Sequence, residues 1–421
     1  MIAPIRFQFR SPRRWRVALA LLVAVMPVGL GPSSLRPTAA ALDDEVRALW
    51  VTRASITTPD AIASLVRSAR AGGFNTLLVQ VRGRGDAYYP STLEPRAHAL
   101  AGAPADFDPL QTILTLAHAE RLRVHAWINV NLVSSSVELP RSRAHVVYRH
   151  PDWLMVPRAL AVELARVDVR SPQYVGRLAR WTRAEPAVEG LFASPLHPAA
   201  ADHVVRVVED LAERYPLDGV HLDYLRYPGP AFDYSRSALA AFYRDMAPTL
   251  ADAARARIDP RSVNDLAALA DRNAERWAGF RRSRLNALVI RLRTAIKQQR
   301  PAALLSAAVF PDSAEAAAHR FQDWGIWLEN GLIDVVCPMA YTPDAAVFDA
   351  QIASARQLAG AQPVWAGIGA YRLSSAQTVR NIQSARRLGA RGVVLFSYDS
   401  LVRPPRGADY LARVGRAAFA P

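Results

Sequence analysis

Eight short runs rich in β-branched and apolar residues recur along the chain and alternate with amphipathic, helix-like stretches. The strand-like runs cover residues 47–52, 76–82, 123–131, 219–223, 304–310, 334–341, 364–368 and 392–397, and helix-like segments such as 59–71, 109–121, 200–214, 273–300 and 375–388 lie between them. Strands that alternate with helices pair in parallel, so eight such units predict a closed (β/α)8 TIM barrel. The alternative is an open doubly wound sheet, but no glycine-rich phosphate-binding turn follows the first run. We therefore expect one barrel domain over residues 45–418.

Two connections are much longer than the others: residues 132–218 after the third run and residues 224–301 after the fourth. Insertions of this length on a barrel often build the walls of a substrate cleft, although they can also be plain elaborations. The first insertion is rich in Trp, Tyr, Arg and His, which favours a cleft wall.

Polar residues alternate with apolar ones in the second, third and fourth runs. Since successive side chains of a strand point to opposite faces, the apolar set should face the helices and the polar set the barrel interior. The residues predicted to face inward are Gln80, Arg82, His125, Trp127, Asn129, Asn131, His221 and Asp223. In barrels of this kind, polar residues at the C-terminal strand ends form the active site.

Residues 1–41 have the composition of a targeting segment. Five arginines precede an apolar run at 17–30, no acid appears before Asp43, and three alanines occupy 39–41. This order predicts a signal peptide and export to the periplasm or the outside of a bacterial cell. The alternative is an uncleaved N-terminal anchor, which would be the only membrane contact that the sequence predicts.

The chain is strongly basic, with a formal charge of +15 that falls to +9 when the six arginines of the leader are removed. Such a charge favours anionic envelope polymers or nucleic acid as partners. We find no nucleic-acid motif and the basic residues are scattered, so we expect a polysaccharide and no nucleic acid. Cys337 is the only cysteine, which excludes an intramolecular disulfide and a cysteine-based metal site. No motif indicates a cofactor, and none indicates an oligomeric state.

The segment 215–228, YPLDGVHLDYLRYP, resembles the glycosyl-hydrolase-like family 10 of exported bacterial envelope proteins. Further matching segments follow in the family's order from about Glu45 to about Leu401: residues 47–51, 74–90, 125–129, 150–154, 194–198, 334–341 and 396–400. The resemblance implies a barrel that hydrolyses glycan chains, with cell-wall glycan lacking its stem peptides as one substrate type. The chain departs from many members in having no lipoprotein cysteine, and in ending its fifth run with Val309-Phe-Pro-Asp312.

Glycoside hydrolysis needs two carboxyl groups that flank the scissile bond. Asp223 ends the fourth run and points inward, and its resemblance to the fourth-strand Asp of barrel glycosidases implies a nucleophile or base supported by a cation at His221. A structural Asp bonded to the next loop is the alternative. For the general acid we favour Asp312 after the fifth run, with a helix cap as its alternative. Asp86 and Asp399 compete for that role.

A second set of residues is expected to bind the substrate through ring stacking, hydrogen bonds and charge. These residues are Arg82, Asp86, His125, Trp127, Asn129, His221, Arg226, Tyr227, Tyr341, Tyr371 and Asp399. For the aromatic residues core packing is the alternative. Arg82 and Arg84 could bind an anionic sugar or lactyl group. For Arg84 a surface salt bridge is the alternative. No metal site is expected, since His221-x-Asp223 has no third ligand.

Two functions remain open at this point. The first is a glycoside hydrolase that cleaves a cell-envelope polysaccharide with a carboxylate pair. The second is a catalytically silent barrel that binds envelope glycan as a scaffold, which the absence of a clear second carboxylate keeps open.

Overall fold

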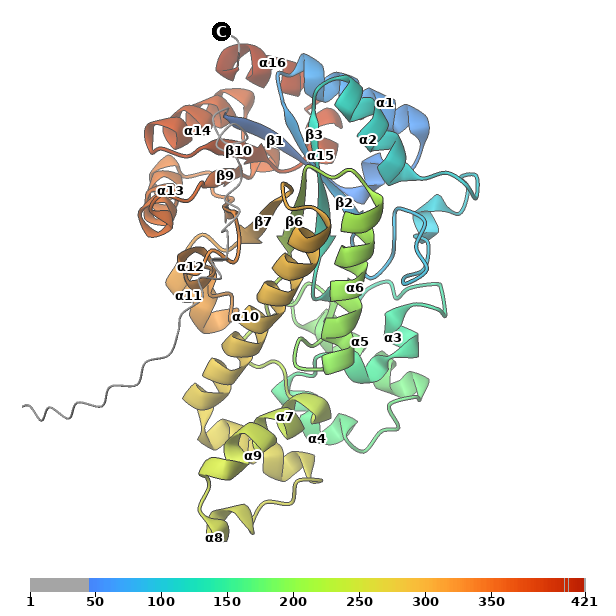
Figure 1. Cartoon of the computed structure of the whole chain (residues 1–421), viewed down its shortest axis with the longest axis vertical. Helices are drawn as coiled ribbons and strands as arrows, with labels where there is room; N and C mark the ends of the chain where they lie inside the picture. Colours follow the sequence, from blue (N-terminus) through green and yellow to red (C-terminus); the bar gives the residue numbers. More distant parts are fainter. Residues whose placement is uncertain (1–44, 405, 408, 420–421) are drawn as a thin grey trace, which may run out of the picture. The chain divides into compact units, whose positions relative to one another are not determined.

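Eight parallel strands close into a barrel in the computed structural model, which describes residues 45–404, 406–407 and 409–419. The barrel strands are β1 (Val46–Val51), β2 (Thr76–Arg82), β3 (Arg123–Asn129), β6 (Gly219–Asp223), β7 (Leu304–Val309), β8 (Val335–Ala340), β9 (Trp365–Ile368) and β10 (Gly392–Leu395). Around the barrel they follow the order β1-β10-β9-β8-β7-β6-β3-β2 (Figure 1). Each predicted run overlaps one of these strands, and the predicted (β/α)8 barrel is confirmed.

Helices cover the outside of the barrel. They are α1 (Pro59–Ala71), α2 (Pro109–Ala119), α6 (Pro198–Arg214), α10 (Ala274–Gln299), α11 (Ser313–His319), α12 (Trp324–Glu329), α13 (Ala345–Ala359), α14 (Ser375–Arg387), α15 (Tyr398–Val402) and α16 (Asp409–Ala418). Side-chain caps start several of them: Thr58 accepts a hydrogen bond from the Ala61 N–H, and Asp108 accepts one from Gln111. The outward-facing apolar residues of the strands pack against these helices in the largest core cluster.

The interior of the barrel is filled by a separate cluster of large side chains. Trp50, Trp127 and Trp365 pack there with Cys337, whose thiol is buried. Glycine is required beside these rings, because a Cβ on Gly219 would lie 2.3 Å from Nδ1 of His125. The packed interior makes the barrel a core and not a pore, so any cavity must open at a strand end.

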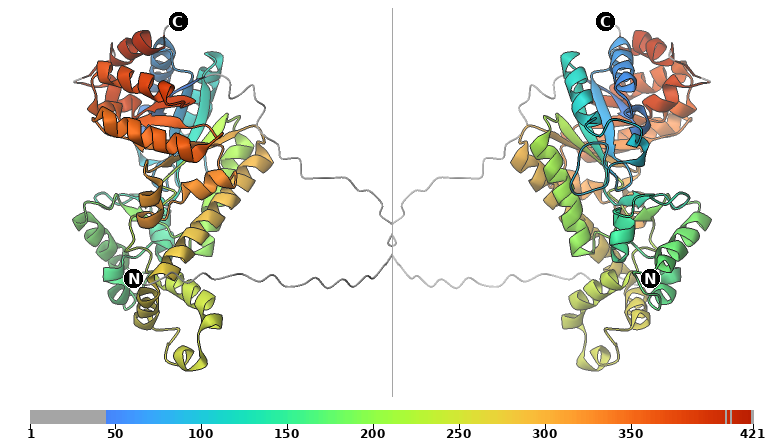
Figure 2. Two further views of the ribbon diagram at one scale, coloured as in Figure 1. Left: turned by 90° about the vertical axis from the view of Figure 1, so that its left-hand side faces the viewer. Right: turned by 90° about the vertical axis from the view of Figure 1, so that its right-hand side faces the viewer.

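The two predicted insertions are present and pack on each other. The first contains the antiparallel pair β4 (Leu132–Ser134) and β5 (Leu191–Phe192), and the helices α3 (Val146–Arg149), α4 (Ala161–Leu164) and α5 (Pro172–Ala184); the second contains α7 (Arg236–Met246), α8 (Asp252–Arg255) and α9 (Val263–Arg272). Both contribute to one hydrophobic cluster that includes Trp153, Phe242 and Trp277. Figures 1 and 2 show these green and yellow segments gathered beside and below the lower part of the paired helices α6 and α10.

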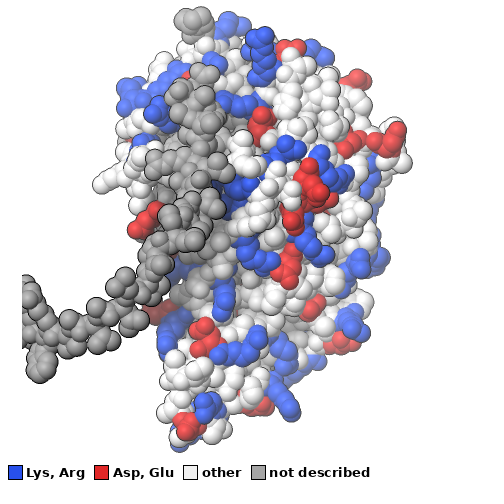
Figure 3. Space-filling view, in the orientation of Figure 1, with Lys and Arg blue, Asp and Glu red and all other residues white. Residues whose placement is uncertain are grey.

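The surface of the described chain mixes both signs of charge. On the face drawn in Figure 3, Lys and Arg side chains are interspersed with Asp and Glu. Among residues 45–404, 406–407 and 409–419, none of the helices is both long enough and apolar enough to cross a membrane. The predicted signal peptide or anchor at 1–41 lies outside the described residues.

A bulge near the end of β2 changes the direction of Arg82. Gln80 pairs with Trp127 of β3, but Arg82 pairs with Ile128, so the strand gains one residue between them. Arg82 is therefore turned away from the side that Gln80 faces and is 1% exposed. The prediction that Arg82 faces inward and binds substrate is wrong, because its guanidinium is used inside the protein.

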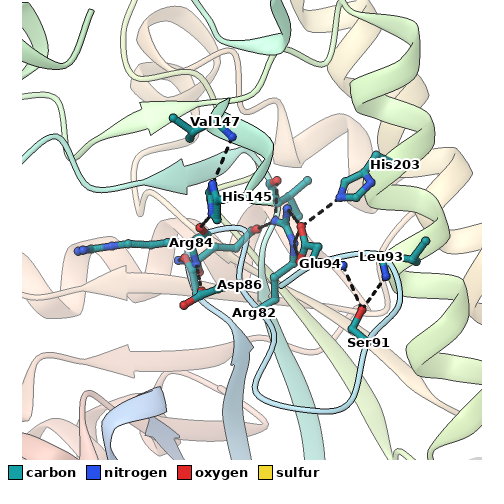
Figure 4. Close-up of polar contacts among 12 residues, drawn as sticks. Arg82, Arg84, Asp86, Ser91, Leu93, Glu94, His145, Val147 and His203 are labelled. Carbon is teal, nitrogen blue, oxygen red and sulfur yellow. Dashed lines mark hydrogen bonds and ion pairs between the residues drawn. The ribbon is translucent and has the colours of Figure 1, made fainter. Parts of the chain in front are cut away.

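The partner of Arg82 is Glu94, at 2.6 Å, in the loop after β2 (Figure 4). His203 of α6 approaches the same carboxylate at 3.1 Å. Burial alone would raise the pKa of Glu94, but the charge of Arg82 and the hydrogen bonds from His203 and Arg82 lower it to about 2. This group of three side chains joins β2, its loop and α6.

We predict that Glu94→Gln destabilises the fold by about 3–5 kcal/mol at neutral pH, because Arg82 would be left buried without a counter-ion. The folded-state pKa of Glu94 lies below its ordinary 4.5, so its contribution is complete above about pH 4.5 and is lost as the pH falls toward 2. Urea unfolding should show a smaller difference between the two proteins at pH 3 than at pH 7.

Glu163→Gln is the matched control, because Glu163 pairs with Arg177 on the surface, where the two side chains are 50% and 40% exposed. It should cost less than about 1 kcal/mol at either pH. Equal costs for the two substitutions would contradict the role of the buried pair.

Candidate functional site

A cavity of about 490 Å³ opens at the C-terminal ends of the barrel strands. It contains five of the predicted site residues: Trp127, Asn129, Asp223, Arg226 and Tyr341. It also contains Gln80, which was expected to face inward, and Arg84, which was expected to bind an anionic group. Arg53, Tyr88 and Tyr224 line it as well, and the sequence analysis did not assign these three to the site. The C-terminal strand ends are where barrel enzymes place their active sites.

Asp223 is the carboxylate that lines this cavity within the described chain. It ends β6 and is 6% exposed. Its Oδ1 accepts hydrogen bonds from the Tyr224 N–H at 2.6 Å and from Nη1 of Arg226 at 3.1 Å. Both bonds use the same oxygen, so Oδ2 is the atom with which Asp223 can meet a substrate.

The turn after Asp223 is sharply bent. Tyr224 has a φ of +50°, a conformation that costs energy for a residue with a side chain and that is concentrated at functional sites. The bend brings Arg226 back over the Tyr224 ring, with its guanidinium carbon 3.9 Å from the ring centre. Burial works against the charge of Arg226, but Asp223, Tyr224 and Glu189 raise its pKa above the ordinary value.

His221 is not the expected cation beneath Asp223. Burial, followed by the proximity of His125, lowers the pKa of His221 to about 3, so its ring is neutral. The indole N–H of Trp50 donates to Nε2 at 3.0 Å, so the proton is on Nδ1, which donates to Oγ of Ser306 at 2.9 Å. Both nitrogens are occupied, which contradicts roles in substrate or metal binding. Arg226 is the cation beside Asp223.

His125 and Tyr227 belong to the core. His125 is 1% exposed, and burial lowers its pKa to about 4. Tyr227 is 0% exposed and packs edge-on against Phe321, 5.2 Å between ring centres. The prediction that these two residues contact sugar is not supported, because neither lines the cavity.

The three other carboxylates that the sequence suggested each accept a hydrogen bond from a backbone N–H. Asp312 accepts a hydrogen bond from the Glu315 N–H and caps α11, which is the alternative role that the sequence analysis gave it. Asp399 accepts from the Thr52 N–H and from Ser55 Oγ. Asp86 accepts from the Arg84 N–H and lines an adjoining cavity. None of the three lines the cavity of Asp223, so the assignment of Asp312 as general acid loses its structural basis.

Glu189 is a carboxylate that the sequence analysis missed. It lies in the first insertion just before β5, its side chain is 36% exposed, and its Oε1 is 3.7 Å from Nη2 of Arg226. Asp223 binds Nη1 of the same guanidinium. One planar fork thus separates the two carboxyl groups, which keeps their nearest oxygens within the roughly 9.5 Å that glycosidase pairs span. No sequence signal marked Glu189, because it does not follow a barrel strand.

Aromatic and amide groups complete the cavity. Trp127 lines it, and its indole N–H has no hydrogen-bond partner in the part of the chain that the structure describes. Tyr341 stands edge-on to Trp50, and to Tyr371, which is 39% exposed. Asn129 donates to the Gly83 carbonyl at 2.7 Å. This combination of rings and fixed polar groups suits a sugar.

The comparisons with known proteins agree with this architecture. The family model described as "Glycosyl hydrolase-like 10" matches residues 45–385. Glycosyl hydrolase YngK of Bacillus subtilis is 23% identical over 414 residues, which cover 87% of this chain and 70% of the relative. Glycosyl hydrolase DigH of Escherichia coli K12 is 23% identical over 301 residues, which cover 64% of this chain and only 55% of the relative.

Among solved structures, the glycoside hydrolase domain of PgaB (BpsB) from Bordetella bronchiseptica superimposes with a TM-score of 0.61. It is 17% identical and covers 90% of this chain and 100% of that domain, a likeness of fold alone. The family model covers well over half of the chain. The expectation drawn from the YPLDGVHLDYLRYP segment is confirmed: the chain belongs to the glycosyl hydrolase-like 10 family.

Proposed function

We propose that this protein is an exported glycoside hydrolase that cleaves a cell-envelope polysaccharide. Peptidoglycan glycan strands lacking stem peptides are one substrate type that the family resemblance implies. The observation that carries the proposal is Asp223, a carboxylate held at the strand end by a backbone N–H and an arginine, with one oxygen toward a cavity lined by aromatic rings. Export rests on the leader-like composition of residues 1–41.

Asp223 acts as the nucleophile or as the base that activates water. Two donors on Oδ1, one of them a guanidinium, favour its charged form, which either role requires. They also fix the direction of Oδ2. The neutral His221, which precedes Asp223 by two residues on β6, helps to position this carboxylate but adds no charge beside it.

Glu189 is our candidate for the general acid. Its carboxyl group, which the first insertion supplies, lies near Nη2 of Arg226, whereas Asp223 binds Nη1 of the same guanidinium. A proton donated to the leaving glycosidic oxygen has to come from a carboxyl on the opposite side of the scissile bond from the nucleophile or base. The shared contact with Arg226 supports Glu189 for this role, whereas Asp312 caps α11 away from the cavity.

One observation favours a second candidate function, a barrel that binds glycan without cleaving it. In the described chain, Asp223 is the one carboxylate among the residues that line the cavity, and Glu189 stands outside it. Zymography on purified cell-wall glycan, with and without stem peptides, separates the two functions. Clearing supports the hydrolase, and binding without clearing supports the scaffold.

We predict that Asp223→Asn lowers kcat by at least roughly 10²–10⁴-fold while the fold is kept, because the amide has the shape of the carboxylate without its charge. Reducing-end release from soluble glycan measures the rate, and circular dichroism checks the fold. Full activity in a folded variant would refute the mechanism.

Asp312→Ala is the comparison for that experiment. It removes the cap of α11 and should cost about 0.5–2 kcal/mol of unfolding free energy, with turnover within a factor of two of the wild type. A loss of activity as large as that of Asp223→Asn would restore Asp312 to the active site.

Glu189→Gln should slow hydrolysis of native glycan by roughly 10²-fold or more, because the leaving oxygen would depart unprotonated. An aryl glycoside, whose leaving group needs no proton, should recover most of the rate. Glu185→Gln, in the same loop and exposed, is the control and should leave both rates unchanged. Equal loss on both substrates would remove Glu189 from the acid role.

A further inference from the structure

A second cavity, of about 540 Å³, adjoins the one that holds Asp223. The two share Arg53 and Arg84, whose side chains line both. The second cavity also has Ser135 and Ser142 on its walls, from the first insertion. A chain of sugars that runs from one cavity into the other must therefore pass these two arginines.

The turn that carries Arg84 is fixed from three directions. The Gly83 carbonyl accepts from Nδ2 of Asn129, and the Arg84 N–H donates to Asp86. The Arg84 carbonyl is 2.8 Å from Nε2 of His145, whose Nδ1 accepts the Val147 N–H, so that Nε2–H is the donor (Figure 4). These three hydrogen bonds fix the peptide units on both sides of Arg84 before any ligand binds.

Both glycines of this turn are needed. A Cβ on Gly83 would lie 2.7 Å from Nη1 of Arg53, so the Arg53 side chain rests directly on the Gly83 backbone. Gly85 has a φ of +69° and packs against His145. The glycines thereby bring Arg53 and Arg84 together.

The two guanidiniums differ in their partners. Arg53 donates to Oε1 of Gln80 at 2.7 Å. The Arg84 side chain extends away from the Arg82–Glu94 pair in Figure 4, and within residues 45–404, 406–407 and 409–419 its guanidinium has no hydrogen-bond or ion-pair partner. Burial, and then the charge of Arg53, lower the pKa of Arg84. A half-buried, unpaired cation beside a second cation is an arrangement that a bound anion would stabilise.

We infer that Arg84, with Arg53, forms a subsite for a carboxylate carried by the sugar unit next to the one at Asp223. The inference rests on the proposed function and narrows its substrate class to acidic glycans. A planar fork matches the two oxygens of a carboxylate, which can belong to a uronic acid ring or to a lactyl ether on a hexosamine.

The test uses calorimetric binding to the Asp223→Asn protein, so that no substrate is consumed. The probes are a hexosamine oligosaccharide with lactyl groups on alternate units, the same compound with its carboxyl groups reduced, and an oligouronate. The lactyl compound or the oligouronate should bind more tightly than the reduced form, and the tighter of the two identifies the source of the carboxylate. Equal affinity for all three probes would overturn the subsite.

Adding Arg84→Gln should weaken binding of the preferred acidic probe by roughly 10- to 100-fold and leave the reduced probe unchanged. Arg84→Lys keeps the charge without the fork and should give an intermediate loss, which also covers a failure of the Gln variant to fold. Arg177→Gln, on α5, should change nothing. Equal weakening of acidic and reduced probes would mean that Arg84 only holds the turn and would refute the subsite. Charge-dependent binding in a wild type that cleaves no glycan would uphold the subsite and refute the hydrolase.

Discussion

The hydrogen bond between Trp50 and His221 crosses the interior of the barrel, and the site above depends on it. The two residues come from β1 and β6, which have β2 and β3 between them on one side and four strands on the other. Ser306 occupies the second nitrogen of His221, so a buried polar ring is fully satisfied and neutral. With Trp127 and Trp365 it fills the interior below Asp223. The only approach to the carboxylate that this packing leaves is from the C-terminal strand ends.

The charged residues at the C-terminal strand ends are held there at a cost in folding free energy. Arg226 is 4% exposed and Asp223 is 6% exposed, and a buried ion pair of this kind seldom repays the loss of its hydration. The left-handed Tyr224 adds backbone strain in the same turn. Charged groups that lie in a cleft although their burial and strain destabilise the fold are typical of functional sites. The Arg82–Glu94 pair is also buried but lines neither of the two cavities described above, and we assign it to stability.

Sequence patterning was sufficient for the barrel because the eight runs and the helices between them are regular. The same patterning placed Trp127, Asn129 and Asp223 correctly, since β3 and β6 keep strict alternation up to their ends. It failed for Arg82 because a one-residue bulge reverses parity, and a bulge leaves no mark in the order of apolar residues. For Asp312 a local signal existed: an acid three residues before Glu315 at a helix start is a capping pattern.

Glu189 shows where sequence reasoning about a barrel reaches its limit. Its loop is positioned by β5, whose partner is β4, and Ala193 just beyond donates to the Asn131 carbonyl at 2.7 Å. Asn131 in turn donates to the carbonyl of Arg226. The insertion and the turn after Asp223 are therefore one hydrogen-bonded unit, although Glu189 lies 37 positions before Arg226 in the sequence. In the proposed mechanism the barrel supplies Asp223 and the insertion supplies its partner, so a change in the insertion alone would convert a glycan-cleaving barrel into one that only binds.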